Sequence, residues 1–381
     1  MTAAPLDGLR VLDLSTVVAG PNCARYLADF GATCIKVERP GSGDSLRNLA
    51  WRDPADGVGL WWKLVNRNKW AVALDLKDPG DLEELRGLAA DADVLVENFR
   101  PGTLERLGLG PDELLAVNPR LVITRVTGFG QTGPYRHRPG FATIAESMSG
   151  LAAISGDPGG QPLLPPIALT DEITGLAAAF ATMVAVHHAR AGGGGQVVDV
   201  TLIESLLQIM SPLVSLYATT GELQGRLGAG LPYSVPRGTY RCSDGTWVGV
   251  SASSDSVAGR LMALLGVGDD ARLATFAGRI EHRDEVEQRL ADFCAARSQA
   301  EVIAAFEGAE AAVGPVMTMA DIAEDPHYLA RHAIVDVGGA AMQGVLAKLS
   351  ATPGLARWPG RPLGQDTDLV RRRGWNLPDH P

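Results

Sequence analysis

The chain has 381 residues, of which 46% are hydrophobic, and this is enough apolar material to bury a large core in two lobes. Its 44 acidic residues outnumber its 34 basic residues, and the net charge of -10 argues against a general surface for nucleic acid or for an anionic membrane. A ligand that carries phosphate would therefore need a local cluster of basic side chains.

Short β-branched runs recur in the first half of the chain, and helical patterns lie between them. The predicted strands are residues 9–15, 34–39, 70–76, 93–99 and 121–127. Helices are predicted at residues 21–32 and 79–92, the second of which begins with proline and acidic residues, as a helix N-terminus should. This alternation predicts an α/β fold, with a mostly parallel sheet whose two faces are covered by helices. Ligands of such sheets lie at the carboxyl ends of the strands.

The composition changes after about residue 225, where glycine and proline become frequent. Residues 238–253 read as a β-hairpin that turns at Asp244 and Gly245, and helical patterns follow at 284–297 and 298–311. We expect a second, smaller α+β domain here. The domain boundaries that we predict are 1–222 for the large domain, 223–332 for the small domain and 333–381 for a C-terminal segment.

The four cysteines are scattered, with neither a CxxC pair nor the spacing of metal ligands: Cys23, Cys34, Cys242 and Cys294. We expect reduced, mostly buried thiols in a cytoplasmic protein, with no disulfide and no metal site. The N-terminus lacks the charged and apolar regions of a signal peptide, and the most apolar stretch, residues 175–187, is too short to span a bilayer. A soluble protein without a membrane partner is predicted.

A literal GxGxxG occurs at residues 128–133, directly after a predicted strand. The following residues, PYRHRPG, contain two prolines and a glycine and do not open the helix that would receive a pyrophosphate. The motif therefore does not predict binding of NAD or FAD.

The first predicted strand leads into a tight turn at Gly20 and Pro21, whose backbone amides could cradle an anionic or adenine-bearing ligand. Any α/β fold needs such a turn, so the turn alone decides nothing. Basic residues also fall just after one predicted strand or just before the next: Arg39, Arg47, Arg67, Lys69, Arg100 and Arg106. In an acidic protein these charges could form one local phosphate site, although each alone is equally explained as a solvated surface charge.

Asp171 and Glu172 lie at the start of the long apolar segment 167–190. A carboxylate there stabilises the first turn of a helix by about 1 kcal/mol, which is the simpler interpretation. The alternative is chemical: a carboxylate fixed at the mouth of a buried helix, next to Pro165 and Pro166, can act as a nucleophile. No GxSxG elbow, catalytic cysteine pattern or HExxH motif competes with it.

Several long motifs, taken in their order, resemble those of family III CoA-transferases, the family of formyl-CoA, carnitine and mesaconyl-CoA transferases and of acyl-CoA racemases. The segments that carry the resemblance are 11–47, 66–80, 92–110, 128–151 and 171–205. In this family the catalytic aspartate opens a DxxxG helix, and the matching residues here are Asp171 and Gly175. The resemblance implies a Rossmann-like large domain and CoA-transferase activity.

The resemblance also implies contacts with coenzyme A, which would be a substrate thioester rather than a cofactor. Val17, Val18 and Ala19 would meet the adenine; Arg39, Lys69 and Arg106 would face the phosphates; Asn98 and Phe99 would line the pantetheine path. Members of the family form dimers whose subunits interlock like two rings, with the large lobe built from both chain ends. We therefore expect a homodimer in which residues 333–381 return to the large domain.

The implied chemistry is transfer of CoA from an acyl-CoA to a carboxylic acid through a mixed anhydride and a thioester of Asp171. Holding the weak carboxylate nucleophile against the thioester would supply much of the rate, an advantage of roughly 7 to 11 kcal/mol in well-oriented systems. With a pKa near the usual value of about 3.9, Asp171 would be ionised at neutral pH and would need no general base.

Three departures from the family pattern bear on specificity. Racemases carry a histidine after the glycine of the RPGF segment, where this sequence has Phe141, so transfer is favoured over racemisation. The polar residues soon after that glycine are Thr143 and Glu146, and Val18 stands where some transferases have glutamine. A racemase and a non-catalytic CoA-binding protein remain the alternatives to a transferase.

The substrates are not identified by the motifs. Arg136, His137 and Arg138 in the YRHRP segment could pair with a second carboxylate and suit a dicarboxylic acid such as succinate, mesaconate or itaconate. A solvated loop is the alternative interpretation of these three residues.

Overall fold

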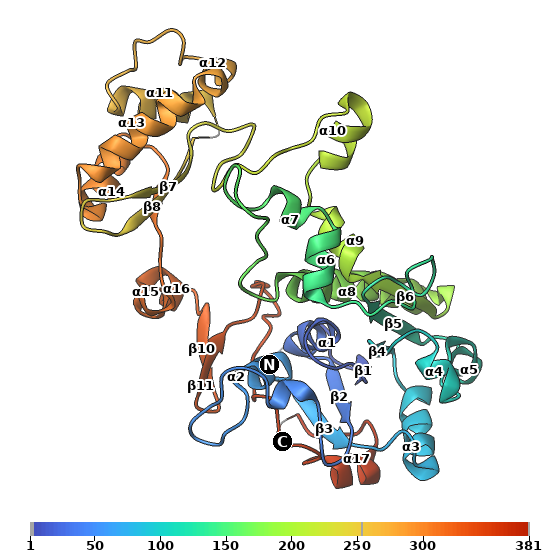
Figure 1. Cartoon of the computed structure of the whole chain (residues 1–381). Helices are drawn as coiled ribbons and strands as arrows, with labels where there is room; N and C mark the ends of the chain where they lie inside the picture. The colour runs from blue at the N-terminus through green and yellow to red at the C-terminus, as the bar shows by residue number, and fades with distance from the viewer. Residues whose placement is uncertain (1–3, 253, 380–381) are drawn as a thin grey trace. The chain divides into compact units, whose positions relative to one another are not determined.

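The computed structural model describes residues 4–252 and 254–379 (Figure 1). They form two compact units. Unit 1 comprises the described residues up to Ser149, then Pro165–Met210 and the described residues from Pro326 onward; unit 2 comprises Gly150–Leu164 and Ser211–Asp325. These limits differ from the boundaries expected after residues 222 and 332. Helix α10 (Leu213–Thr220) belongs to unit 2 and buries none of its side chains, whereas the composition of the sequence changes only after about residue 225.

Unit 1 is built on a six-stranded sheet in the order β3-β2-β1-β4-β5-β6. The strands are β1 (Arg10–Asp13), β2 (Thr33–Glu38), β3 (Lys69–Ala73), β4 (Val94–Glu97), β5 (Val122–Thr127) and β6 (Gln196–Thr201). All five pairings are parallel. The predicted α/β class and the five predicted strands are confirmed, and β6 is an addition. This strand order reverses direction between β1 and β4, so the loops that leave these two strands open a crevice.

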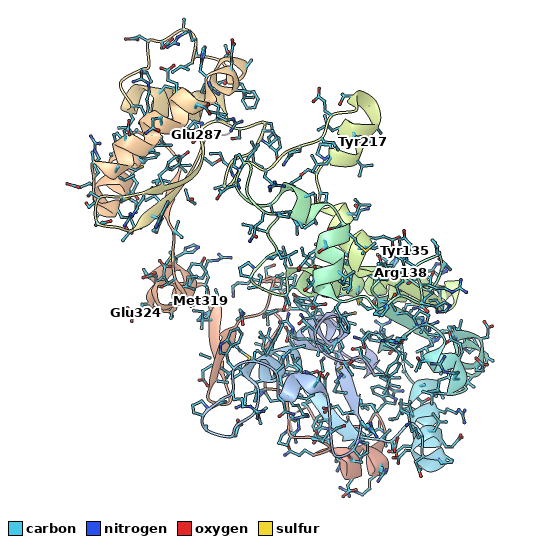
Figure 2. The ribbon with its side chains drawn as sticks, in the orientation of Figure 1. Tyr135, Arg138, Tyr217, Glu287, Met319 and Glu324 are labelled. Carbon is cyan, nitrogen blue, oxygen red and sulfur yellow. The ribbon has the colours of Figure 1, made fainter. Side chains whose placement is uncertain are left out.

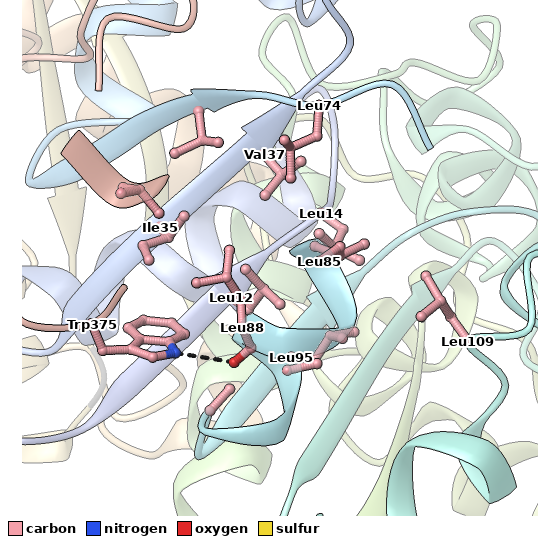
Figure 3. Packing of buried hydrophobic residues seen from close by; sticks show 14 of the residues in the cluster. Leu12, Leu14, Ile35, Val37, Leu74, Leu85, Leu88, Leu95, Leu109 and Trp375 are labelled. Carbon is pink, nitrogen blue, oxygen red and sulfur yellow. Dashed lines mark hydrogen bonds between the residues drawn. The ribbon is translucent and has the colours of Figure 1, made fainter. Parts of the chain in front are cut away.

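Helices cover both faces of the sheet. On one face α1 (Ala19–Asp29) packs against α8 (Leu169–His188), and α8 also contacts β5 and β6. On the other face α3 (Pro79–Ala90), α5 (Pro111–Val117) and α17 (Thr367–Arg373) cover alternate residues of the strands, such as Ile35 and Val37 of β2. Figure 3 shows this second core, in which Leu85 and Leu88 of α3 pack over the strand residues.

The C-terminal segment closes the free edge of the sheet at β3. The carboxylate of Asp366 accepts a hydrogen bond from the backbone N–H of Ala71 at 2.9 Å, and Thr367 accepts one from Ala73 at 3.0 Å. The indole of Trp375 donates to the carbonyl of Leu88 at 3.0 Å (Figure 3). The bonds of Asp366 and Thr367 satisfy backbone donors that the edge strand would otherwise expose.

The remaining elements of unit 1 are short. They are η1 (Ser45–Arg47), α2 (Leu60–Val65), α4 (Thr103–Arg106), α6 (Ala142–Met148), the π-helical turn η2 (Ala189–Gly193), α9 (Leu202–Gln208), α16 (Pro326–Ala330) and the antiparallel strands β10 (Ile334–Val337) and β11 (Ala340–Gln343).

Unit 2 contains a three-stranded antiparallel sheet in the order β7-β8-β9 and a separate apolar core. Its elements are α7 (Leu151–Ile154), α10, β7 (Arg237–Arg241), β8 (Trp247–Ser251), α11 (Asp255–Leu264), α12 (Phe276–Glu281), α13 (Arg283–Ala295), α14 (Gln299–Gly308), β9 (Val313–Pro315) and α15 (Met319–Glu324). The predicted hairpin is confirmed. Gly245 adopts the left-handed conformation that its turn requires, and Asp244 accepts a hydrogen bond from the N–H of Thr246 at 3.1 Å.

The segment Leu169–Gly193, which includes α8, is long and apolar enough to cross a membrane by length and composition alone. The expectation that the most apolar stretch is too short to span a bilayer was therefore wrong about its length. The same test is passed by core helices, and α8 buries small side chains such as Ala178, Ala179 and Thr182.

Candidate active site

One side chain, from the loop after β4, bridges the crevice at the carboxyl ends of β1 and β4. The amide oxygen of Asn98 accepts a hydrogen bond from the N–H of Thr16 at 2.8 Å, and its amide nitrogen donates to the carbonyl of Thr16 at 2.7 Å. Asn98 thus clamps the turn that follows β1. Its predicted position beside the pantetheine path stays a prediction, but both ends of its amide are occupied by the turn.

The turn after β1 is strained at Val17, whose φ of 68° lies in the left-handed region that a β-branched residue rarely adopts. The carboxylate of Asp44 accepts hydrogen bonds from the Val17 N–H at 3.0 and 3.2 Å and so holds this conformation. Val18 and Ala19 are buried. Of the three residues predicted to meet the adenine, Val17 alone has a partly exposed side chain. Strain of this kind is found at ligand sites, which makes the turn a candidate binding element.

Lys69 does not face solvent, so the prediction that it contacts a phosphate of coenzyme A is wrong. Its side chain is 1% exposed, and its ammonium group donates to the carboxylate of Asp13 at 2.9 Å, the carbonyl of Pro21 at 2.7 Å and the amide oxygen of Asn66 at 3.0 Å. Three acceptors use all three donors of a lysine. Lys69 therefore stabilises the buried base of the turn after β1 and has no donor left for a ligand.

Two of the other basic residues near the strand ends are also structural. Arg47 forms a two-point ion pair with Glu38, with distances of 2.7 and 2.8 Å, and its guanidinium stacks 3.7 Å from the ring centroid of Trp62. Arg67 is fully buried and pairs with Asp29 at 2.6 Å. Such pairs tie loops of unit 1 together and leave little of either guanidinium for a phosphate.

Three arginines remain exposed at the carboxyl ends of the strands. Arg39 follows β2, while Arg100 and Arg106 follow β4, so they flank the turn after β1 on both sides. Within residues 4–252 and 254–379, neither Arg39 nor Arg100 has an ion-pair partner, and Arg106 donates only to the hydroxyl of Thr103, at 2.9 Å. These guanidinium groups are available to an anionic ligand, whereas the buried basic residues are not. The predicted phosphate contacts of Arg39 and Arg106 stay predictions.

Phe99, the other residue predicted to line the pantetheine path, is half-buried against the sheet core. Its backbone N–H donates to the carboxylate of Glu97 at 2.6 Å. Phe99 is therefore only partly used in packing against the core, and its predicted role stays a prediction.

Asp171 lies in the first turn of α8, which begins at Leu169. It does not cap the helix, because no side chain accepts a capping hydrogen bond at this end. Glycine 175, one turn later, allows α8 to approach α1: a Cβ atom there would lie 2.7 Å from the Cβ of Asn22 and 2.9 Å from the carbonyl oxygen of Ala19. The DxxxG spacing therefore fixes the mouth of α8 beside the turn that leads into α1.

The carboxylate of Asp171 is partly buried and has no counter-ion. Among the described residues, no side chain makes a hydrogen bond or an ion pair with it. Burial raises its pKa to about 6, and the negative charges of Glu172 and Glu146 add to the increase. The expectation of a pKa near 3.9 was therefore wrong, although a group with a pKa of about 6 is still about nine-tenths ionised at pH 7.

The two neighbouring acids are held in place by their own partners. Glu172 accepts a hydrogen bond from the amide of Asn22 at 2.8 Å, and Glu146 of α6 accepts one from the hydroxyl of Thr170 at 2.9 Å. The part played by Glu146 beside Asp171 could not be foreseen, since the chain between their two helices includes α7 and passes through unit 2 before it returns to unit 1. The spacing of Glu146 from its neighbours carries no signal of this contact.

The segment predicted to bind an acceptor acid is an exposed loop. Arg136 donates to the ring of His137 at 3.0 Å, and the guanidinium of Arg138 lies 3.8 Å from the ring centroid of Tyr135. Figure 2 labels Tyr135 and Arg138 in this part of the chain. Phe141 is also exposed and directly precedes α6. No helix begins at the glycines of the GxGxxG segment, because the next helix, α6, starts at Ala142.

The four cysteines are buried and unpaired, as expected. Burial raises the pKa of Cys23 and of Cys34 to about 12 and that of Cys294 to about 11. Thiols with such values are poor nucleophiles at neutral pH. Asp171 therefore remains the candidate nucleophile of unit 1.

The fold and the site define a class, namely a Rossmann-like α/β protein with a crevice between β1 and β4, where folds of this class bind ligands, and an aspartate of raised pKa at the start of α8. Comparison with known proteins identifies the family. The sequence pattern described as CoA-transferase family III matches residues 6–367. The chain belongs to this family and is a CoA-transferase.

Relatives with assigned activities match over nearly the whole chain. Succinyl-CoA–D-citramalate CoA-transferase of Chloroflexus aurantiacus is 39% identical over 379 residues, which cover 96% of this chain and 94% of the relative. The β subunit of succinyl-CoA–L-malate CoA-transferase from the same organism is 39% identical over 380 residues, covering 97% and 94%. A crystal structure of a CaiB/BaiF family protein from Brucella suis superimposes with a TM-score of 0.87 at 29% identity and covers 97% of this chain and 99% of that one.

Proposed function

We propose that the protein moves CoA from an acyl-CoA to a carboxylic acid through covalent intermediates on Asp171. The observation that carries the proposal is the state of this side chain, which is partly buried, lacks a counter-ion in the described chain and lies near two other acids. Such surroundings destabilise the free carboxylate and leave it a stronger nucleophile than a solvated one.

Each step of the proposed reaction exchanges one bond at a carbonyl carbon. A carboxylate oxygen of Asp171 attacks the thioester carbonyl, the C–S bond breaks, and CoA leaves as the thiolate with the electron pair. The thiolate then attacks the aspartyl carbonyl of the mixed anhydride, and the donor acid leaves as a carboxylate. The acceptor carboxylate attacks the aspartyl thioester, releasing thiolate, and the thiolate finally takes the acceptor acyl group. Asp171 is regenerated without net proton transfer.

The start of α8 offers donors for the oxyanion that forms in these steps. The backbone N–H groups of Thr170 and Asp171 have no hydrogen-bond acceptor among the described residues, whereas that of Glu172 bonds to Ala168 at 3.1 Å. Free N–H groups at a helix start are suited to stabilise a developing negative charge. We assign them this role.

We propose that CoA itself binds along the crevice between β1 and β4. The exposed guanidinium groups of Arg39, Arg100 and Arg106 supply the positive charge that its phosphates need, and the strained turn at Val17 lies between them. No cofactor other than the CoA of the substrate is required by the proposed steps, and we expect a cytoplasmic location.

We propose that the donor and acceptor acids are dicarboxylates whose main chain has four carbons, counting both carboxyl carbons. This proposal is supported by the two Chloroflexus relatives, which are named for succinyl-CoA and for citramalate or malate. Arg136, His137 and Arg138 are exposed and could reach a second carboxylate, but Arg138 is stacked on Tyr135 and would have to leave it.

The racemase alternative lacks an imidazole at Phe141, and a non-catalytic CoA-binding protein has no need of a nucleophile such as Asp171. The three possibilities predict different products. Racemisation would place solvent deuterium at the acyl α-carbon, and binding alone would produce neither exchange nor transfer.

The test is to incubate the protein with succinyl-CoA and analyse the peptide that carries Asp171 by mass spectrometry. We expect an adduct on Asp171 that hydroxylamine removes, and transfer to malate or citramalate in a panel of acids. Asp171→Asn should lower transfer by at least about a thousandfold, since it removes the nucleophile. Asp157→Asn, in the chain of unit 2, is the matched control. Undiminished transfer by Asp171→Asn would overturn the mechanism, and rejection of every dicarboxylate would overturn the substrate proposal alone.

A further inference from the structure

Glu146 is a charged group that the proposed reaction does not use. It lies on α6, is 3% exposed, and its carboxylate accepts a hydrogen bond from the Thr170 hydroxyl at 2.9 Å. No cation pairs with it in the part of the chain that the structure describes. A glutamine would accept the same hydrogen bond without placing an uncompensated charge in the interior, where a charge is costly. The hydrogen bond alone therefore does not explain why an acid stands at this position.

The charge of Glu146 acts on Asp171. Glu146 is bound to Thr170, the residue that precedes Asp171 in the chain, and its negative charge is one of three causes of the raised pKa of Asp171, after burial and Glu172. Glu172 is itself tied through the amide of Asn22 to Arg25, whose guanidinium donates to the same amide at 2.8 Å. Glu146 has no such compensation.

The charged groups on the other elements packed against α8 do not offset the negative charges near Asp171. From α1 the charged and titratable groups nearest to this region are Arg25 and Tyr26, which lie on the side of Glu172. Among the described residues of α9, β5 and β6, no charged group contributes to the pKa of Asp171. The acidic surroundings of Asp171 therefore come from Glu172 and Glu146, from two different helices.

We propose that Glu146 is a positioning residue for acyl transfer: it fixes the first turn of α8 through Thr170, and its charge disfavours the free carboxylate of Asp171 relative to the acylated side chain. This inference rests on the proposed function. When Asp171 attacks the thioester, a C–O bond forms, the C–S bond breaks, and the negative charge moves from the aspartate to the departing thiolate. The fixed negative charge of Glu146 favours that displacement, because the repulsion between Glu146 and Asp171 disappears when Asp171 becomes neutral.

The variant Glu146→Gln tests the charge, since glutamine keeps the size and the acceptor for Thr170. We expect the pH midpoint for labelling of Asp171 by succinyl-CoA to move down by about half a unit or more, because a like charge has been removed. We also expect the acylated fraction at steady state to fall severalfold at pH 8. The fold should be retained, with an unchanged or higher melting temperature. Glu146→Asp keeps the charge and shortens the side chain, so its midpoint should stay near that of the wild type even if its rate falls.

Glu83→Gln is the matched control, since it removes one acid of unit 1 whose side chain is 76% exposed and which does not act on Asp171. A midpoint and an acylated fraction in Glu146→Gln equal to those of the wild type and of the control would overturn the inference. Equal changes in Glu146→Gln and Glu146→Asp would reduce Glu146 to a packing role and would also overturn it. If Asp171→Asn transferred CoA normally, the proposed function would fall instead, so the two failures are distinguishable.

Discussion

At the scale of single residues, Asp171 shows how position and surroundings act in opposite directions. The first turn of a helix stabilises a carboxylate, because the helix dipole presents its positive end there. Burial and two neighbouring acids outweigh this effect and raise the pKa of Asp171 to about 6. The position is visible in the sequence, but the surroundings arise only when α6 and α8 pack together.

The raised pKa predicts the pH dependence of the first half-reaction. The rate at which succinyl-CoA labels Asp171 without an acceptor should be constant above about pH 7 and fall through a midpoint near pH 6, since the protonated acid is not a nucleophile. An aspartate with an ordinary pKa would place the midpoint near pH 4. Labelling rates between about pH 4.5 and pH 8.5 check this, and a rate that is still constant at about pH 5 would contradict it.

The basic residues show what a pattern of spacings can and cannot predict. Their places beside the strand ends follow from the alternation of strands and helices, and all are found there. The direction of each side chain does not follow from it: Arg39 comes after a strand and points to solvent, while Lys69 opens one and is buried on Asp13. Sequence spacing alone does not predict which basic side chains form ion pairs with acidic residues of the same protein.

At the scale of elements, the contact between α1 and α8 fixes the position of Asp171. Gly175 leaves no room for a Cβ atom against Asn22 and Ala19. The close approach brings the amide of Asn22 to Glu172, one residue from Asp171. The glycine of the DxxxG motif therefore has a packing reason that is separate from the chemistry of the aspartate.

We predict that Gly175→Ala lowers the free energy of unfolding by about 1 to 3 kcal/mol, because the added methyl group overpacks the helix contact. It should also reduce transfer, since α8 must shift at its start. The matched control is Gly87→Ala in α3, where a Cβ atom would meet nothing within 4 Å. That variant should be neutral or more stable by up to about 1 kcal/mol, from helix propensity. Urea unfolding of the three proteins checks both values, and a wild-type stability of Gly175→Ala would contradict the packing argument.

The strands were predictable because they are short runs rich in β-branched and apolar residues that alternate with helical patterns, and some, such as residues 121–127, are flanked by glycine and proline. The sixth strand was harder to recognise, since β6 has an exposed first half and lies directly after the glycine-rich turn 192–195. Residues 150–164 lie with unit 2 through contacts such as that of Arg226 with the carbonyl of Gly160 at 2.7 Å, which no local pattern announces.

At the scale of the whole molecule, unit 1 exposes apolar side chains on three helices that contact one another, α6, α8 and α9. The exposed residues are Ile144, Met148, Leu176, Phe180, Val184 and Leu207. A group of exposed apolar side chains on neighbouring helices is typical of a surface that contacts another protein. We propose that a second copy of the chain covers it, which is the homodimer expected from the family.

The dimer is tested by light scattering after gel filtration. We expect the wild type to elute with twice the mass of the chain and Phe180→Glu to elute as a monomer. Phe180 is 73% exposed on α8, and burying an unpaired charge at this position in an interface would cost free energy. Val117→Glu introduces the same charge at an exposed apolar position of α5 and should not change the mass. A monomeric wild type, or a dimeric Phe180→Glu, would contradict the proposal.

The bonds from Asp366 and Thr367 to β3 join residues that are almost 300 positions apart in the chain. During synthesis, β3 leaves the ribosome long before the segment that seals its edge, and all of residues 211–325 emerge in between. Contacts of such separation form slowly, since a long loop must close first. We therefore expect the edge of the sheet at β3 to be covered only after release of the finished polypeptide, and nascent chains stalled before Asp366 to bind chaperones that recognise open strand edges.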